Sequence, residues 1–475
     1  MLLSRLIESI ECKDVEGFFE REISDVTESS HECSEQTVFV AVRGTRRDGN
    51  DYISEARKRG CDVFVSEKKL KINDGETLIF CKNARKTLAE IAKLLYGTSI
   101  NKIKFVGITG TKGKTATAKY TAELLFAAGK KCVLFGTLGV SFFGVDMQDF
   151  FTENTTADAV TLYKSLGAAA QRGAEIAIIE VSSQALTQSR VYGIPFDICV
   201  FTNFSKDHIG EYEHKNLDEY FEAKRSLFRD FGAGTAIVNS KDKRCFEISR
   251  GVREVIFAEP QCVVSEQHRV SFQYDGKSFF VSGAGAFNAE NATLALAVAR
   301  KLTGLDLTFF ASALANTRIA GRFEAYTLYG KTVIIDFAHN AASFEAVISE
   351  AKSFTKGKLI VLFGSVGGRC YKRRRELAEI SEKYADISVI TSDNPDFEEP
   401  AAITEEIYGF YKDKSVCRVI PDRTEAVAYA VKIAKSGDTV LLLGKGHERF
   451  QLEKGVKRLF SERALLISMG ADFIC

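Results

Sequence analysis

The chain has 475 residues, which is too long for a single hydrophobic core and predicts two to four domains. Hydrophobic residues make up 45% of the chain and charged residues 27%, the balance of an ordinary soluble protein. Lysine and arginine number 64 against 63 acidic residues, so no overall positive charge would attract nucleic acid or an anionic membrane. We expect neither of them as a partner.

Cysteine use and hydropathy favour a cytoplasmic protein. Eleven cysteines are scattered from Cys12 to Cys475 without a C-x-x-C pair, which indicates reduced thiols and not a disulfide framework. Acidic residues occur too early at the N-terminus for a secretory signal, and no apolar run approaches the length of a membrane span. We expect the protein to act as a monomer in the cytoplasm.

Three blocks of strand and helix patterns follow one another. The first alternates helical stretches, such as 84–95, with short strand-like runs at 37–42, 63–66 and 77–80. From Lys104 the pattern becomes strand, glycine-rich turn and helix, typical of a parallel sheet, with further buried strands at 176–181, 197–202 and 236–239. Near Arg322 a third block begins, with strands at 332–336, 359–363, 387–391 and 439–443. The predicted fold class is α/β with three domains, at 1–100, 101–322 and 323–475.

A glycine-rich loop is the strongest local motif. Residues 105–115 are Phe-Val-Gly-Ile-Thr-Gly-Thr-Lys-Gly-Lys-Thr, and a predicted helix follows and ends at Gly129. In such a loop, backbone N–H groups wrap phosphate oxygens, the Lys114 ammonium meets the β- and γ-phosphates, and the Thr115 hydroxyl binds Mg²⁺. The strict G-x-x-x-x-G-K-[ST] form fails because Ile108 stands where its first glycine belongs. The alternative is merely a tight turn, but strand, glycines, Lys-Thr and helix together favour a nucleotide loop.

Three other features carry weaker signals. Glu180 closes the strand at 176–181, where a carboxylate suits Mg²⁺, although an acid after a strand is common. His208 follows another buried strand, and a lone histidine is usually structural or exposed to solvent. The basic run at 372–375 is more in keeping with a solvated helix start than with a nucleic-acid patch.

The loop at 107–115 resembles the nucleotide loop of the Mur ligases and of their folylpolyglutamate synthetase relatives, and the resemblance continues along nearly the whole chain. It implies an N-terminal UDP-binding α/β domain, a central P-loop-type ATPase domain with a parallel sheet, and a C-terminal Rossmann-like domain that binds the incoming amino acid. It also implies an ADP-forming acid–amino-acid ligase. Such an enzyme phosphorylates a substrate carboxylate, and an amine then attacks the acyl phosphate.

The resemblance assigns roles in the central domain. ATP would be held by Gly110, Thr111, Lys112, Gly113, Lys114 and Thr115. His208 falls in a T-N-x-x-x-D-H motif that carries a second metal ligand, and Lys224 lies in a Y-x-x-x-K-x-x-L-F segment whose lysine is carbamylated. A carbamate turns a lysine cation into an anion able to hold a second Mg²⁺, although an ordinary amphipathic helix with a surface lysine fits the spacing equally well. The implied metal ligands are Thr115, Glu180, His208 and carbamylated Lys224, and the implied catalytic residues are Lys114, Lys224 and His208.

Three further motifs resemble nucleotide contacts of the family. Asn288 lies in an F-N-x-x-N motif that contacts adenine, although asparagine is also a good N-cap. Arg322 lies in a G-R-x-E motif and His339 in a segment like D-Y-A-H. These residues would close on ATP only when the domains close. The segment 367–369 resembles the family's loop near the nucleotide.

The motif at 444–451, Gly-Lys-Gly-His-Glu-Arg-Phe-Gln, resembles the G-K-G-H-E-x-x-Q of the MurE branch, which adds the third residue of the stem peptide to UDP-MurNAc-L-Ala-D-Glu. Gly444 and Glu448 would contact the incoming free amino acid, and Asp393 and Asn394 match the D-N-P motif of that branch. The residues that match positions holding the UDP-muramyl peptide are Ser30, Asn154, Thr155, Thr156, Ser182 and Arg190.

The chain departs from the family pattern at three places. D-N-P continues with an arginine in enzymes that take meso-diaminopimelate, and here that residue is Asp396. No guanidinium would then pair with the second carboxylate, which favours L-lysine, with ornithine close behind. The usual Ser-Ser-His is Ser-Ser-Gln184, and the usual Asp-Ser-Arg of the first domain is Ser29-Ser30-His31.

Three alternatives stay open. A P-loop kinase or other NTPase would need Lys114 and Thr115 but neither Lys224 nor the motif at 444–451. A non-catalytic relative that binds UDP-muramyl peptide is supported only by Gln184 and His31. Among ligases, a folylpolyglutamate synthetase is disfavoured by the first domain and by the motif at 444–451.

Overall fold

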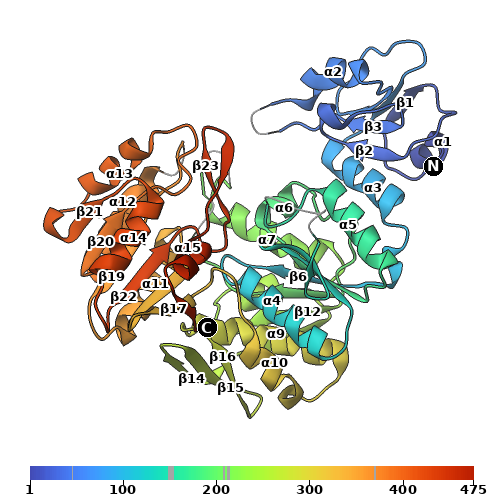
Figure 1. The fold of residues 1–475 in the computed structure, drawn as a ribbon. Helices are drawn as coiled ribbons and strands as arrows, with labels where there is room; N and C mark the ends of the chain where they lie inside the picture. Colours follow the sequence, from blue (N-terminus) through green and yellow to red (C-terminus); the bar gives the residue numbers. More distant parts are fainter. Residues whose placement is uncertain (45–46, 148–153, 207–208, 211–213, 369–370, 475) are drawn as a thin grey trace. The chain divides into compact units, whose positions relative to one another are not determined.

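A computed structural model describes all residues except 45–46, 148–153, 207–208, 211–213, 369–370 and 475 (Figure 1). The predicted metal ligand His208 and the loop residue Arg369 lie outside the described residues. By its internal contacts the chain divides into two compact units, Met1–Glu259 with Leu294–Asp306, and Pro260–Thr293 with Leu307–Cys475. The domain limits at 100 and 322 stay predictions.

The first sheet of unit 1 has the strand order β1-β5-β4-β3-β2, in which β1 alone is antiparallel to its neighbour. Its strands are β1 (Asp14–Gly17), β2 (Asp25–Thr27), β3 (Thr37–Val40), β4 (Val63–Ser66) and β5 (Thr77–Phe80). The helices are α1 (Leu3–Glu8), α2 (Ile53–Lys58) and α3 (Ala84–Tyr96). The Asn83 side chain caps α3 by accepting the Lys86 N–H, which fixes where the predicted helix begins.

The central sheet has the order β13-β12-β11-β6-β10-β7-β8-β9 and is parallel from β13 to β7. Its strands are β6 (Lys104–Thr109), β7 (Cys132–Gly136), β8 (Gly139–Phe142), β9 (Val145–Asp146), β10 (Ile176–Glu180), β11 (Ile198–Phe201), β12 (Thr235–Asn239) and β13 (Glu254–Ala258). Helices that follow these strands are α4 (Lys114–Ala127), α5 (Ala159–Gln171), α6 (Ser183–Thr187), α7 (Leu217–Asp230) and α8 (Cys245–Ile248). Because β6 lies between β10 and β11, the ends of these three strands meet at one edge, where ligands of parallel sheets collect.

The two sheets of unit 1 share one apolar core. Leu88 and Ala92 of α3 belong to the same buried cluster as Leu162 and Leu166 of α5. Burial of this continuous surface stabilises the unit mainly through the hydrophobic effect.

Unit 2 contains a seven-stranded sheet of order β21-β20-β19-β22-β18-β17-β25 and a small antiparallel sheet of order β14-β15-β16. The strands are β14 (Gln261–Glu266), β15 (Arg269–Tyr274), β16 (Lys277–Ser282), β17 (Glu324–Leu328), β18 (Lys331–Asp336), β19 (Leu359–Phe363), β20 (Ile387–Ile390), β21 (Cys417–Val419), β22 (Thr439–Leu443) and β25 (Asp472–Phe473). A separate hairpin pairs β23 (Phe450–Glu453) with β24 (Val456–Leu459). The helices are α10 (Ala311–Asn316), α11 (Ala341–Phe354), α12 (Tyr371–Tyr384), α13 (Pro400–Gly409), α14 (Arg423–Ile433) and α15 (Glu462–Ser468), while α9 (Phe287–Thr303) spans both units.

The predicted buried strands are confirmed within one or two residues at each end, as are the helices at 84–95 and after the phosphate loop. The sheet β14–β16 and the hairpin β23–β24 were not predicted. Within the described residues, no helix is both long enough and apolar enough to cross a membrane.

The basic run at 372–375 is only partly a solvated helix start. Lys372 and Arg375 are exposed, whereas the Arg374 side chain is fully buried. Its guanidinium donates to both carboxylate oxygens of Glu398, at 2.8 and 2.7 Å, and to Glu406. The prediction was wrong for Arg374, because a run of charges on a helix does not reveal which side chain turns inward to acidic partners.

Candidate active site

The phosphate loop joins the end of β6 to the start of α4 in unit 1. Gly110 has a φ of 150°, and a side chain there would collide with the Thr202 hydroxyl. Gly113, with a φ of 80°, stands at the N-cap of α4. The loop therefore presents backbone amides at the positive end of a 14-residue helix, as phosphate binding requires.

Two lysines converge on one carbonyl of this loop. Lys114 Nζ donates to the carbonyl oxygens of Gly110 and Thr111 at 3.0 and 3.2 Å, and Lys224 Nζ donates to that of Gly110 at 2.9 Å. Lys224 is only 1% exposed and lies over the Tyr220 ring, 4.3 Å from its centroid. The alternative of a surface lysine on an ordinary amphipathic helix is therefore wrong.

Glu180 lies at the end of β10, beside the phosphate loop. Its carboxylate accepts the Thr115 hydroxyl at 2.9 Å and the Thr137 N–H at 3.0 Å, and it is almost completely buried. A buried carboxylate beside a threonine hydroxyl fits Mg²⁺, which takes few protein ligands and keeps several waters. Thr137 carries no sequence motif, and its part in this cluster was missed.

Four of the residues predicted to hold UDP-muramyl peptide lie beside Glu180. The Thr155 hydroxyl is 3.1 Å from that of Thr137, and the Thr156 hydroxyl donates to the Glu180 carbonyl at 2.8 Å. The Ser182 N–H donates to Thr156 Oγ1 at 3.0 Å, and Arg190 donates to the Thr156 carbonyl at 2.8 Å. Asn154, which directly precedes Thr155 in the chain, is exposed.

Arg190 has a second partner that the sequence motifs did not supply. Its guanidinium also donates to Gln188 Oε1, at 2.8 and 3.1 Å. Burial lowers the pKa of Arg190, opposed by the neighbouring Asp158 and Glu28 carboxylates. Ser30, the sixth predicted contact, lies in the first sheet's domain, where its hydroxyl donates to Glu55 at 2.9 Å.

A histidine contacts the Ser-Ser-Gln segment, in which Gln184 stands where the family carries a histidine. His214 Nε2 lies 2.9 Å from Ser183 Oγ, and its ring packs 5.1 Å from the ring of Tyr220. Tyr220 in turn reaches the Thr111 hydroxyl of the phosphate loop at 3.2 Å. An imidazole thus contacts the Ser-Ser segment from 31 residues further along the chain, which local motifs do not reveal.

Two predicted nucleotide motifs and the motif at 444–451 meet inside unit 2. The Arg322 guanidinium lies 4.9 Å from the Phe337 ring centroid, and the rings of His339 and His447 pack against the same ring at 4.7 and 4.9 Å. Gly446 has a φ of 52°, and a side chain there would meet Phe337 Cβ at 2.6 Å. The segments around Arg322, His339 and His447 therefore pack together, although more than 100 residues separate the last two.

Asn288, also in unit 2, is the second residue of α9. Its side-chain amide donates to the Ala284 carbonyl at 2.8 Å and is buried. The Asn288 amide thus fixes the turn that leads into the helix.

The D-N-P and G-K-G-H-E-x-x-Q motifs form one buried polar cluster. Lys445 is fully buried, and its ammonium donates to Glu448 Oε2 at 2.6 Å and to Asn394 Oδ1 at 2.8 Å. Asn394 returns a hydrogen bond to Glu448 Oε2 at 3.0 Å. Gly444 approaches Asp393 so closely that a side chain there would lie 2.9 Å from Asp393 Oδ2.

The same cluster raises the pKa of Asp393, because burial disfavours its charged form more than Lys445 and Arg423 favour it. Arg423 was not predicted. It is fully buried, pairs with Glu462 at 2.7 Å, and donates to the carbonyls of Ser392 and Leu443. It ties the two loops that carry the motifs.

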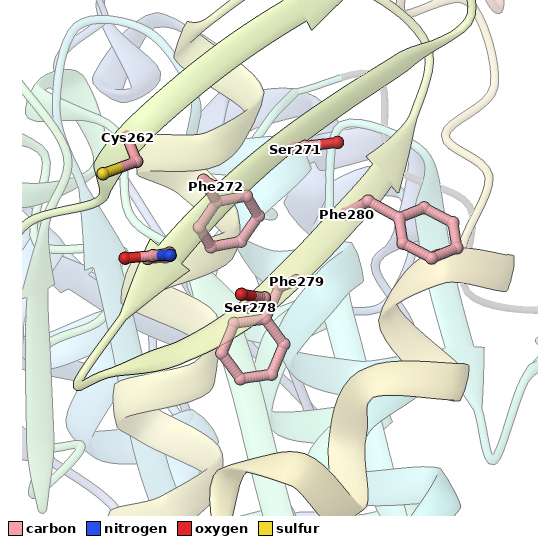
Figure 2. A pocket seen from close by; sticks show the side chains of 7 residues that line it. Cys262, Ser271, Phe272, Ser278, Phe279 and Phe280 are labelled. Atoms are coloured by element: carbon pink, nitrogen blue, oxygen red, sulfur yellow. The ribbon is translucent and has the colours of Figure 1, made fainter.

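A pocket of about 270 Å³ lies on the small sheet β14–β16 (Figure 2). Phe272, Phe279, Cys262 and neighbouring serine and glutamine side chains line it, and none of the residues predicted for the site is among them. Its lining carries no charged side chain, so it offers no ion pair to a phosphate or a carboxylate.

Comparison with known proteins agrees with this geometry. Three sequence profiles match consecutive parts of the chain: Mur ligase family, catalytic domain, at 22–96; Mur ligase middle domain, at 108–299; and Mur ligase, glutamate ligase domain, at 321–446. A UDP-N-acetylmuramoyl-L-alanyl-D-glutamate--2,6-diaminopimelate ligase of Aquifex aeolicus is 34% identical over 96% of this chain and 95% of its own. The chain belongs to the Mur ligase family. As a member, it is an ATP-dependent amide ligase.

A further relative supports the family, and solved structures support the fold. A ligase of the same name from Clostridioides difficile is 32% identical over 98% of both chains. A solved structure of a ligase with that name has a TM-score of 0.67 at 24% identity and covers 99% of this chain and 98% of its own. A folylpolyglutamate synthase of Mycobacterium tuberculosis has a TM-score of 0.64 at 17% identity, but it covers only 76% of this chain and 91% of its own. The three-domain α/β fold predicted for a Mur ligase is thereby confirmed.

Proposed function

We propose that this Mur ligase adds the third residue of the stem peptide to UDP-MurNAc-L-Ala-D-Glu. The proposal rests above all on the buried cluster in which Lys445 joins Asn394 of D-N-P to Glu448 of G-K-G-H-E-x-x-Q. Relatives at 30–34% identity over nearly the whole chain are named as ligases of this substrate. We propose that the UDP-linked peptide binds at the cluster of Thr155, Thr156, Ser182 and Arg190.

In the first step, the γ-phosphoryl group of ATP moves to a carboxylate of the peptide. One P–O bond to ADP breaks, and one to the carboxylate oxygen forms. Lys114 and the N–H groups at the start of α4 neutralise and orient the phosphates, which supplies most of the catalysis of phosphoryl transfer. Thr115 and Glu180 would hold a Mg²⁺ ion, which neutralises phosphate charge when it is bound.

In the second step, the amine of the incoming amino acid attacks the acyl carbon. A C–N bond forms, the bond to phosphate breaks, and inorganic phosphate leaves together with a proton from the amine. Asp393 and Glu448 are the acceptors that would hold the amino group of the incoming amino acid, which attacks as the neutral amine. Because Lys445 already pairs with Glu448, the site stays close to electrically balanced.

A second Mg²⁺ is part of the proposal, held by Lys224 as a carbamate and by His208. Burial of Lys224 Nζ at the Gly110 carbonyl puts the side chain in reach of the phosphate loop. Carbamylation of Lys224 replaces a cation there by an anion.

L-lysine is the proposed third residue. Asp396 follows D-N-P, so no guanidinium pairs with a second substrate carboxylate at this position, and the aspartate charge repels one. The relatives named above carry diaminopimelate in their names, and a diaminopimelate product would keep the enzyme class while contradicting the argument from Asp396.

The reaction class is tested by ADP release. Purified protein with ATP, Mg²⁺ and UDP-MurNAc-L-Ala-D-Glu should release ADP continuously only after L-lysine or another accepted amine is added. Lys114→Ala should lower kcat by roughly 10²–10³-fold, because the ammonium group that donates hydrogen bonds to the phosphates is lost. Lys119→Ala, on the same helix but paired with Glu123, is the control and should keep the wild-type rate. Continuous ADP release without any amine would contradict ligation.

A further inference from the structure

Asp396 fastens the hairpin β23–β24 to the D-N-P loop. Its N–H donates to the Leu452 carbonyl at 2.9 Å, and its own carbonyl accepts the Lys454 N–H at 2.6 Å. Its carboxylate accepts the Gly455 N–H at 3.0 Å, at the turn of the hairpin. One residue therefore makes three hydrogen bonds to one turn.

The backbone of Asp396 is in the left-handed region, with a φ of 52°. Aspartate and asparagine tolerate this region better than other non-glycine residues, because their short side chains can bond locally. A long side chain at 396 would give up the acceptor for Gly455. The residue type at 396 thus matches the needs of the hairpin.

The fastened hairpin is continuous with the amino-acid cluster. Next to Asp396, Asn394 Oδ1 accepts the Leu452 N–H at 2.9 Å while also accepting the Lys445 ammonium. At the start of the hairpin, Gln451 donates to the Ser392 hydroxyl at 2.6 Å. A shift of the hairpin would therefore disturb Asn394, and with it the hydrogen bond from Asn394 to Glu448.

We infer that Asp396 is a positioning residue, which holds the hairpin 450–459 as a fixed wall of the amino-acid site through its acceptor oxygen. The inference rests on the proposed function for the meaning of that site, but the hairpin contact exists whatever the substrate is. Asp396 then both holds the hairpin and leaves no guanidinium for a second carboxylate, and the aspartate charge itself is not needed for holding the turn.

The test compares three variants of the full-length protein by hydrogen–deuterium exchange. Asp396→Gly removes the acceptor and still allows a positive φ. Asp396→Asn keeps an oxygen acceptor and removes the charge. Glu399→Gln serves as control, because it removes a neighbouring carboxylate whose contact with Lys454, at 3.4 Å, is exposed. Peptides covering 450–459 should exchange at least tenfold faster in Asp396→Gly, and they should regain protection in Asp396→Asn.

Kinetics with the accepted amine provide the second readout. In Asp396→Gly, the KM for the amino acid should rise about fivefold or more, with the KM values for ATP and the UDP-linked peptide unchanged. Asp396→Asn should recover most of that loss, and Glu399→Gln should match the wild type.

Unchanged exchange of the hairpin in Asp396→Gly would overturn the inference. So would an Asp396→Asn variant that regains protection but stays as impaired in KM as Asp396→Gly, because the carboxylate charge, and not the acceptor oxygen that holds the hairpin, would then set the affinity for the accepted amine. If no amine is ligated at all, the proposed function fails, whereas the exchange result still decides whether Asp396 holds the hairpin.

Discussion

At the scale of single residues, Lys224 carries the most specific claim about the chemistry. Its ammonium is buried against the phosphate loop, where an unmodified lysine adds a second cation beside Lys114. We predict that Lys224→Ala lowers ligation by roughly 10²–10³-fold and that short-chain carboxylates such as acetate partly restore it, because they supply the missing anion. The measurement compares initial rates without carboxylate and with carboxylate at roughly 50 to several hundred millimolar.

The matched control is Arg229→Ala, on the same helix α7 but half-exposed and paired with Asp230. It should keep full activity and show no response to carboxylates beyond that of the wild type. A fully active Lys224→Ala variant would refute the carbamate. An inactive variant that carboxylates do not rescue would indicate that Lys224 has only a structural role.

Sequence motifs contain the residues that we propose to bear the chemistry, but not all of the residues that contact them. Lys114, Glu180, Asn394 and Glu448 stand in recognisable patterns, and the structure puts them in buried polar clusters. Thr137, Gln188 and His214 stand in no motif that the sequence analysis used. The contacts of Thr137 and His214 join segments brought together only by folding, so a local pattern cannot predict them. Gln188 lies only two residues before its partner Arg190, but it belongs to none of the motifs.

At the scale of secondary-structure elements, the ion pair between Arg423 of α14 and Glu462 of α15 is the sharpest target. Both side chains are fully buried, and Glu462 Oε2 has no hydrogen-bond partner within the described residues. Burial raises the pKa of Glu462, and the Arg423 guanidinium opposes this. Arg423→Met should therefore cost about 3–5 kcal/mol of unfolding free energy at neutral pH, because it leaves a buried charge unpaired.

The sign of the pH dependence follows from the same raised pKa. A carboxyl whose pKa is higher in the folded protein than in the unfolded chain binds its proton more readily when folded. Arg423→Met should then lose stability as the pH rises from about 5 to 8, by up to about 1.4 kcal/mol per pH unit. Urea denaturation at both pH values measures this. The double variant Arg423→Met/Glu462→Leu should recover stability and lose the pH dependence, and an equal loss at both pH values would contradict the account.

Elements were predictable where burial alone shapes the sequence. The central strands β10, β11, β19 and β22 are buried along their whole length and stand out as apolar runs. The hairpin strand β24 is exposed at every position, so it carries no apolar pattern. It is held by antiparallel pairing with β23, and Asp396 in turn bonds to Leu452 of β23 and to the turn residue Lys454, which a sequence pattern cannot reveal.

At the scale of the whole molecule, the α/β class and the three blocks followed from the alternation of buried strands and helices along the chain. The family followed from the resemblance of the loop at 107–115 and of the later motifs to those of the Mur ligases. The predicted ATP residues fall on both compact units, with the phosphate loop on one and Asn288, Arg322 and His339 on the other. Apolar periodicity specifies the core of each unit. It does not reveal at which residue one compact unit ends and the next begins. That is why the limits at 100 and 322 remain predictions.

The central claim is that the chain is a third-residue ligase, and product mass tests it most directly. The purified protein is incubated with UDP-MurNAc-L-Ala-D-Glu, ATP and Mg²⁺, with L-lysine, ornithine or meso-diaminopimelate added singly. The account predicts a product heavier by one lysine residue, with ornithine accepted less well. A diaminopimelate product alone would refute the argument from Asp396 but keep the ligase, and no product with any of the three amines would contradict the proposed function.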